Sequence, residues 1–178
     1  MLDGEGNTIF LSAFLANRLD IAWFCVEHGA SINTRNKAFQ FALKHAVNQN
    51  NMELVEQLLE KGADPNTVDE KGRSVLHYAV NNSANRAQGF NATFDLEALL
   101  ISYGGAVSAR DKRGRTPLHY AFVRIGSYQD CSTSDPVETV SSLCVAKDVD
   151  PNIQDCLGKT PLHYAAQRAA FISTTYLI

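Results

Sequence analysis

The chain has 178 residues, of which 45% are hydrophobic and 20% are charged, which is the composition of an ordinary globular protein. The formal net charge of −3 does not point to a nucleic acid or a membrane surface as partner. No apolar run reaches the roughly 18–20 residues that span a bilayer, and the N-terminus lacks a basic segment followed by an apolar core, so neither a membrane-spanning nor a secreted protein is expected.

Five segments of the chain fit one frame, Asp-x-x-Gly-x-Thr-Pro-Leu-His-x-Ala, with different degrees of fidelity. They start at residues Asp3, Asn36, Asp69, Asp111 and Asp155. The first three starts are 33 residues apart, and the next two intervals are 42 and 44 residues. Similarity at a spacing near 33 residues predicts a repeat architecture, and we number the units one to five from these starts.

Units one and two, residues 3–35 and 36–68, match the frame least well. Unit one carries the apolar run Trp23–Cys25 where a terminal unit would have polar residues, so we expect a segment of a longer array. Unit two has Phe39 in the place of the turn glycine. Because glycine adopts the required backbone conformation far more readily, we expect a distorted turn in this unit.

Units three to five contain the clearest copies of the motif, RSVLHYA, RTPLHYA and KTPLHYA, and these residue types predict the start of an α-helix. Thr116 suits the N-cap position, where its hydroxyl accepts a hydrogen bond from a free amide of the first turn. Pro117 follows at the first helical position, where a missing N–H costs nothing. His119 lies in the same turn, close enough to lock the threonine through a hydrogen bond.

A second helix is predicted in each unit from apolar residues spaced i, i+4, i+5, which form one stripe of an amphipathic helix. The stripes are Ile21, Cys25 and Val26; Leu54, Leu58 and Leu59; Leu96, Leu100 and Ile101; Val140, Cys144 and Val145; and Leu177 with Ile178. The glycine that follows should end the helix in a left-handed conformation. One such helical hairpin cannot bury its apolar face alone, so neighbouring units must stack.

The frame, the period and the TPLH motif resemble the ankyrin repeat family over nearly the whole chain. The resemblance implies an all-α fold, an ankyrin-type solenoid of stacked helix-turn-helix repeats joined by hairpin-like turns, with no real sheet. It also implies one domain over residues 1–178. The repeats are expected at approximately 3–35, 36–68, 69–110, 111–154 and 155–178, the last one cut short. Residues added at about 81–93 and 124–134 are either functional or disordered loops.

The motif histidines His77, His119 and His163 occupy the same slot in successive units. Helix layers pack about 10 Å apart, so these side chains cannot converge on one metal ion, and capping explains all three. The tyrosine after each histidine is interpreted as packing between repeats, with a peptide-reading ladder as the alternative. We expect no catalytic residue, no cofactor and no metal in this chain, and no small-molecule substrate.

Four cysteines, Cys25, Cys131, Cys144 and Cys156, lie far apart in the sequence without a CxxC pair. This pattern favours reduced thiols over a disulfide framework or a zinc site. A cytoplasmic location is therefore expected, with the nucleus as the alternative.

In the ankyrin family the binding surface is usually the concave face, made of hairpin tips and first-helix positions, and the resemblance implies the same face here. Eleven of the 16 basic residues fall on this face by position, whereas the second helices carry acidic residues such as Glu56 and Glu60. The candidate partner-binding residues are Lys71, Arg73, Asn82, Lys112, Arg113, Arg115, Arg124, Lys159 and Arg168. The arginines among them are expected to be exposed. The alternative is that these charges are ordinary solvated surface.

The preferred function is a non-catalytic protein-interaction module that presents a basic concave surface to an acidic or polar peptide or protein segment. One alternative is an accessory region of a larger enzyme or scaffold, which positions a catalytic domain outside this chain. A weaker alternative is binding of a polyanion, either RNA or anionic lipid.

Overall fold

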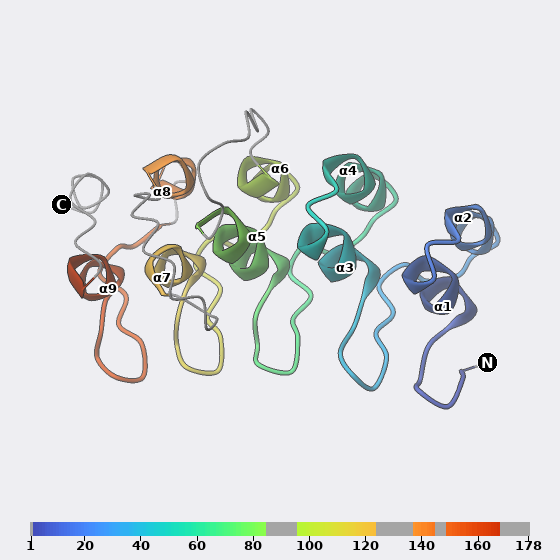
Figure 1. The fold of residues 1–178 in the computed structure, drawn as a ribbon, viewed down its shortest axis with the longest axis horizontal. Helices are drawn as coiled ribbons and strands as arrows, with labels where there is room; N and C mark the ends of the chain where they lie inside the picture. The colour runs from blue at the N-terminus through green and yellow to red at the C-terminus, as the bar shows by residue number, and fades with distance from the viewer. Residues whose placement is uncertain (1, 85–95, 124–136, 145–148, 168–178) are drawn as a thin grey trace.

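The computed structural model describes residues 2–84, 96–123, 137–144 and 149–167, and over these ranges the chain is helical, with a single isolated β-bridge between Val68 and Ser74. The helices are α1 (Ile9–Leu15), α2 (Leu19–Glu27), α3 (Ala42–Asn48), α4 (Met52–Glu60), α5 (Val75–Ala84), α6 (Leu96–Ser102), α7 (Pro117–Phe122), α8 (Val137–Cys144) and α9 (Pro161–Gln167). Figure 1 shows them in two rows, odd-numbered helices in one and even-numbered helices in the other. The prediction of an all-α solenoid is confirmed.

A hairpin-like turn precedes each odd-numbered helix, and all these turns project to the same side of the molecule (Figure 1). We call them hairpins one to five, at residues 3–7, 36–40, 69–73, 111–115 and 155–159. In each, the amide of the first residue donates to the carbonyl of the fifth at 2.9–3.1 Å, and the amide of the fourth donates to the carbonyl of the first. The recurring frame therefore encodes one turn geometry.

The turn of hairpin two is not distorted, so the expectation based on Phe39 is wrong. Phe39 adopts φ 54°, in the left-handed region that glycine occupies in the other hairpins, and both backbone hydrogen bonds are kept. The side-chain oxygen of Asn36 also accepts from the amide of Gln40 at 2.9 Å, and the Arg35 guanidinium lies 5.3 Å from the Phe39 ring centre. The surrounding turn thus imposes a strained conformation on a residue that disfavours it.

Replacing Phe39 by glycine should stabilise the protein by about 1 kcal/mol, because the left-handed conformation costs an L-residue roughly 1–2 kcal/mol. The melting temperature should rise by about 2–4 °C for a chain of this size. Phe39→Ala is the control, since it removes the ring and keeps the strain, and it should not stabilise. A lower melting temperature for the glycine variant would show that the contacts of the ring outweigh the backbone strain.

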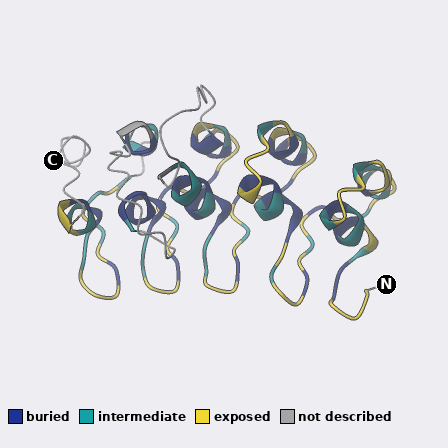
Figure 2. Cartoon of the chain, in the orientation of Figure 1, coloured by how far each residue is buried: buried dark blue, intermediate teal, exposed yellow. Residues whose placement is uncertain are grey.

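The core lies between the two rows of helices and between successive units, where Figure 2 colours many helix residues as buried. Leu54 and Leu96 of the predicted stripes are 5% and 3% exposed, whereas Ile21, at the same place in unit one, is 38% exposed. Ile9 and Phe24 of the same unit are more than half exposed. α1 and α2 thus carry exposed apolar side chains, next to the exposed charged residues Asp20 and Glu27 of α2.

The predicted glycine caps are confirmed. Gly29, Gly62 and Gly104 follow α2, α4 and α6 with φ values of 86–87°. Each amide donates to a carbonyl of the preceding turn at 2.9–3.0 Å, so the helix ends are satisfied before the chain turns toward the next unit.

Candidate interaction surface

The motif histidine closes a polar network at the start of α7. Nδ1 of His119 accepts from the backbone amide of Thr116 at 3.0 Å and lies 3.0 Å from the Thr116 hydroxyl. Nε2 lies 3.1 Å from the carbonyl oxygen of Lys159 in hairpin five, so the ring carries its proton on Nε2 and donates it to the next unit. The predicted lock between histidine and threonine is confirmed, and it also joins unit four to unit five.

His77 makes the same contacts one unit earlier. Its Nδ1 accepts from the amide of Ser74 at 3.1 Å, and its Nε2 lies 3.1 Å from the carbonyl oxygen of Arg115 in hairpin four. Burial lowers the pKa of His77 to about 4 and lowers the pKa of His119 in the same direction. Both rings are therefore neutral near pH 7 and serve as connectors between repeats.

Asp111, the first residue of hairpin four, accepts hydrogen bonds from several neighbouring groups. Its Oδ1 accepts from the amides of Arg113 and Arg115 at 2.8 and 2.9 Å. Its Oδ2 accepts from Nε and Nη2 of Arg115 at 3.1 and 2.8 Å, and from the Tyr120 hydroxyl at 2.8 Å. The Asp111 side chain is 2% exposed and that of Arg115 is 12% exposed. Arg115 is thus bound within the chain, and the expectation of an exposed charge at this position is wrong.

Hairpin three repeats this arrangement with Asp69, Arg73 and Tyr78. The carboxylate accepts from Nε and Nη2 of Arg73 at 2.9 and 2.7 Å and from the Tyr78 hydroxyl at 2.6 Å. Burial by itself would raise the pKa of Asp69, but the hydrogen bonds from Arg73 and Tyr78 outweigh it and lower the pKa to about 2. Arg73, like Arg115, is mostly covered, with 17% of its side chain exposed.

The motif tyrosines pack between units, which confirms the interpretation of these residues as packing. The Tyr120 ring meets His77 of the preceding unit edge-on at 5.0 Å, and the Tyr164 ring meets His119 at 6.0 Å. Burial and then the hydrogen bond to Asp155 raise the pKa of Tyr164 to about 12, so its hydroxyl stays protonated and donates to that carboxylate.

Three of the candidate basic residues, Lys71, Lys112 and Arg113, lie exposed at hairpin tips. The amide of Lys112 donates to the carbonyl of Lys71 at 2.9 Å, and the amide of Cys156 donates to the carbonyl of Arg113 at 2.8 Å. Hairpins three, four and five are therefore joined into one row, whose exposed tips are yellow in Figure 2. The structure brings these three cations onto one continuous edge.

The remaining candidates lie elsewhere. Nζ of Lys159 lies 5.3 Å from the Tyr164 ring centre, next to the base of hairpin five. The Asn82 amide donates to the carbonyl of Val47 at 3.2 Å and so ties α5 to α3. Arg124 and Arg168 lie outside the described residues, as do most of the first inserted segment and all of the second.

Comparison with protein-family models gives a match over most of the chain. A model of three consecutive ankyrin repeats matches residues 9–91 and 43–132, and a model of one ankyrin repeat matches residues 113–156. The chain belongs to the ankyrin repeat family. Ankyrin repeats generally mediate protein–protein interactions, and proteins built from them are typically non-catalytic interaction modules.

The close approach of neighbouring ankyrin hairpins explains the glycine in the frame. A Cβ atom on Gly72 would lie 3.1 Å from the amide nitrogen of Lys112, and one on Gly114 would lie 3.3 Å from the amide nitrogen of Cys156. Both glycines also have positive φ values, 75° and 73°. The glycine therefore permits the turn and also the contact that aligns each tip with the next.

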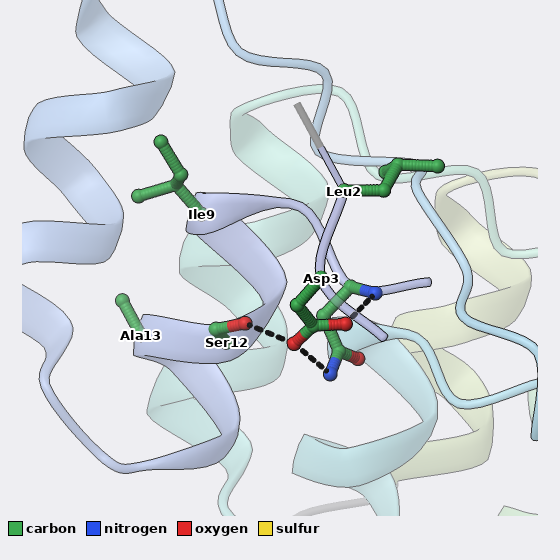
Figure 3. Close-up of a pocket in the computed structure, with 6 residues that line it drawn as sticks. Leu2, Asp3, Ile9, Ser12 and Ala13 are labelled. Carbon is green, nitrogen blue, oxygen red and sulfur yellow. Dashed lines mark hydrogen bonds between the residues drawn. The ribbon is translucent and has the colours of Figure 1, made fainter. Parts of the chain in front are cut away.

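A shallow pocket at the N-terminal end of the ankyrin stack offers a different kind of surface (Figure 3). It is lined by Leu2, Asp3, Asn7, Ile9, Ser12 and Ala13. The Asp3 carboxylate accepts from the backbone and side-chain amides of Asn7, both at 2.8 Å, and from the Ser12 hydroxyl at 3.4 Å. Because the chain itself engages this carboxylate, the pocket presents mainly the apolar surface of Leu2 and Ile9.

Within the described ranges, no three or more histidine, cysteine, aspartate or glutamate side chains are grouped so that they could hold a metal ion. Cys25 and Cys144 are partly buried against the core, and burial raises the pKa of the Cys144 thiol. None of the helices in this part of the ankyrin stack is long and apolar enough to cross a membrane.

Proposed function

We propose that residues 1–178 act as one ankyrin repeat domain that binds an acidic or polar peptide or protein segment through the basic tips of its hairpins. The observation that carries this proposal is the separation of charge within hairpins three and four. Their aspartates, Asp69 and Asp111, are buried against Arg73 and Arg115, whereas other cations remain exposed at the tips. In hairpin four the acidic charge of Asp111 is thus turned inward, whereas Lys112 and Arg113 are exposed.

The positive charge is concentrated on hairpin four. Hairpin four together with the preceding Arg110 carries four basic side chains and one acidic side chain, a formal charge of +3. On hairpin three, Glu70 shares the tip with Lys71, so this tip is mixed. A local field of this kind attracts and orients an acidic segment even though the whole chain is negative.

The other candidate residues have supporting roles in this proposal. Arg73 and Arg115 hold the hairpins in place, and Lys159 and Asn82 extend the proposed surface. A contribution of Arg124 and Arg168, which lie outside the described residues, is part of the same proposal. The reduced thiols of Cys25 and Cys156 support a cytoplasmic or nuclear location for this interaction.

Reversing the charge at the tip of hairpin four tests the proposal. Lys112→Glu combined with Arg113→Glu should weaken binding of a labelled glutamate-rich peptide more than tenfold, or about 1.4 kcal/mol, because the variant repels the carboxylates. The affinity can be measured by fluorescence anisotropy. The melting temperature should barely change, since both side chains are exposed.

The matched control is Glu56→Lys combined with Glu60→Lys, two exposed positions on α4, and it should leave peptide affinity nearly unchanged. If the α4 variant weakened binding and the tip variant did not, the partner would bind the side of the even-numbered helices. Competition with RNA at several salt concentrations separates the polyanion alternative, which requires tighter and more salt-dependent binding of RNA than of the peptide.

A further inference from the structure

The tip of hairpin five differs in chemistry from the other tips. Leu157, its third residue, is 76% exposed, the highest value among the large hydrophobic side chains that the structure describes. The same position is occupied by Glu5, Ala38, Lys71 and Arg113 in hairpins one to four, and it is exposed in every one of them. Leu157 is therefore exposed because of its place in the turn.

The apolar tip lies directly beside the basic tip of hairpin four. The amide of Cys156 donates to the carbonyl of Arg113 at 2.8 Å, and the Cys156 thiol lies 4.0 Å from the carbonyl oxygen of Lys112. Cys156 is itself exposed. The row thus changes from basic to apolar between two hairpins that are held in register.

We infer that the partner segment carries an acidic residue and an apolar residue on the same side, the first for Lys112 and Arg113 and the second for Leu157. The inference rests on the proposed function and specifies the chemistry of its partner. Charge complementarity draws the carboxylate to hairpin four, and an apolar side chain next to it removes the surface of Leu157 from water.

The spacing between the tips sets the spacing in the partner. Packed repeats lie about 8–10 Å apart. A segment in the polyproline II conformation has three residues per turn and a rise of about 3.1 Å per residue, so residues i and i+3 point to the same side about 9 Å apart. The recognised pattern is therefore an acidic residue followed or preceded, three positions away, by an apolar one.

Labelled peptides test this pattern directly. The parent peptide contains Glu-Pro-Pro-Glu-Pro-Pro-Leu, and in the comparison peptide serine replaces the leucine. The wild-type protein should bind the parent at least about fivefold more tightly than the serine peptide. Leu157→Ser should remove this preference and leave the affinity for the serine peptide unchanged, so the two substitutions should be coupled in a double-mutant cycle.

Ala38→Ser, at the same position of hairpin two, is the matched control and should keep the preference for leucine. If wild type binds both peptides equally while Lys112→Glu with Arg113→Glu still weakens both, the acidic–apolar pattern is overturned and the basic binding surface stands. If the charge reversal changes the affinity for neither peptide, both the proposed binding at the basic tips and the acidic–apolar pattern are overturned. Unchanged melting temperatures for Leu157→Ser and Ala38→Ser establish that the comparison reports binding.

Discussion

Replacing Asp111 by alanine should lower the free energy of unfolding by about 3 kcal/mol, although the residue lies in a hairpin and not in the hydrophobic core. Its carboxylate accepts five hydrogen bonds, from two backbone amides, two guanidinium N–H groups of Arg115 and the Tyr120 hydroxyl. The alanine variant leaves a mostly covered guanidinium without its counterion and two amides without their acceptor. Urea unfolding followed by circular dichroism measures the loss.

Two further variants separate the causes. Asp111→Ala combined with Arg115→Met also removes the guanidinium that would otherwise lack a counterion, so part of the stability should return. Asp155→Ala removes the corresponding carboxylate of hairpin five, where Lys159 takes the place of the arginine, and should cost about half as much. A loss of less than about 1 kcal/mol for Asp111→Ala would show that the pair behaves as an exposed surface ion pair.

The features that were predicted correctly from the sequence depend on interactions between residues only a few positions apart. Thr116 and His119 are three residues apart, and their hydrogen bond needs nothing beyond the helix start that both residues favour. Gly62 follows a strongly apolar helical stripe and needs only a left-handed conformation. The shared period and the TPLH motif then imply the stacking of units, because a single helical hairpin cannot bury its apolar face.

The engagement of Arg115 was missed because it depends on three groups that meet only in the folded hairpin. The available signal was an aspartate four residues before an arginine in units three and four, with a tyrosine five residues further on. Phe39 shows the opposite failure, since a rule about one residue was overridden by the hydrogen bonds of the whole turn. The exposure of Ile21 depends on how neighbouring residues pack against α2 in the folded chain, and the apolar spacing within α2 does not determine this packing.

Acidification from pH 7 to pH 4 should lower the free energy of unfolding by about 3 kcal/mol through His77 alone. The pKa of His77 is about 4 in the folded protein, below its ordinary value of 6.5. As the pH falls below about 6.5, the unfolded chain binds a proton that the folded protein excludes, because the buried ring keeps Nδ1 as an acceptor for Ser74. The stabilisation is therefore complete above pH 6.5 and is lost as the pH approaches 4.

Other titratable groups also lower the free energy of unfolding on acidification, and the histidines do so at higher pH than Asp69. Burial also lowers the pKa of His119 and of His45, so the total loss of stability should exceed that from His77. The pKa of Asp69 falls from 3.8 to about 2, so its contribution is lost only below about pH 4. Between pH 6.5 and pH 4, these histidines should therefore account for most of the change.

The variant His77→Gln isolates the contribution of one ring. The glutamine amide can accept from Ser74 and donate to the carbonyl of Arg115, but it does not titrate. The slope of the free energy of unfolding against pH between 6.5 and 4 should therefore fall by about 1.4 kcal/mol per pH unit, the value for one proton. Urea titrations at half-unit pH steps measure this slope independently of the stability that the substitution itself costs at pH 7.5. Parallel curves for wild type and variant would show that His77 exchanges protons equally in the folded and unfolded states, and that the connector between units three and four tolerates charge.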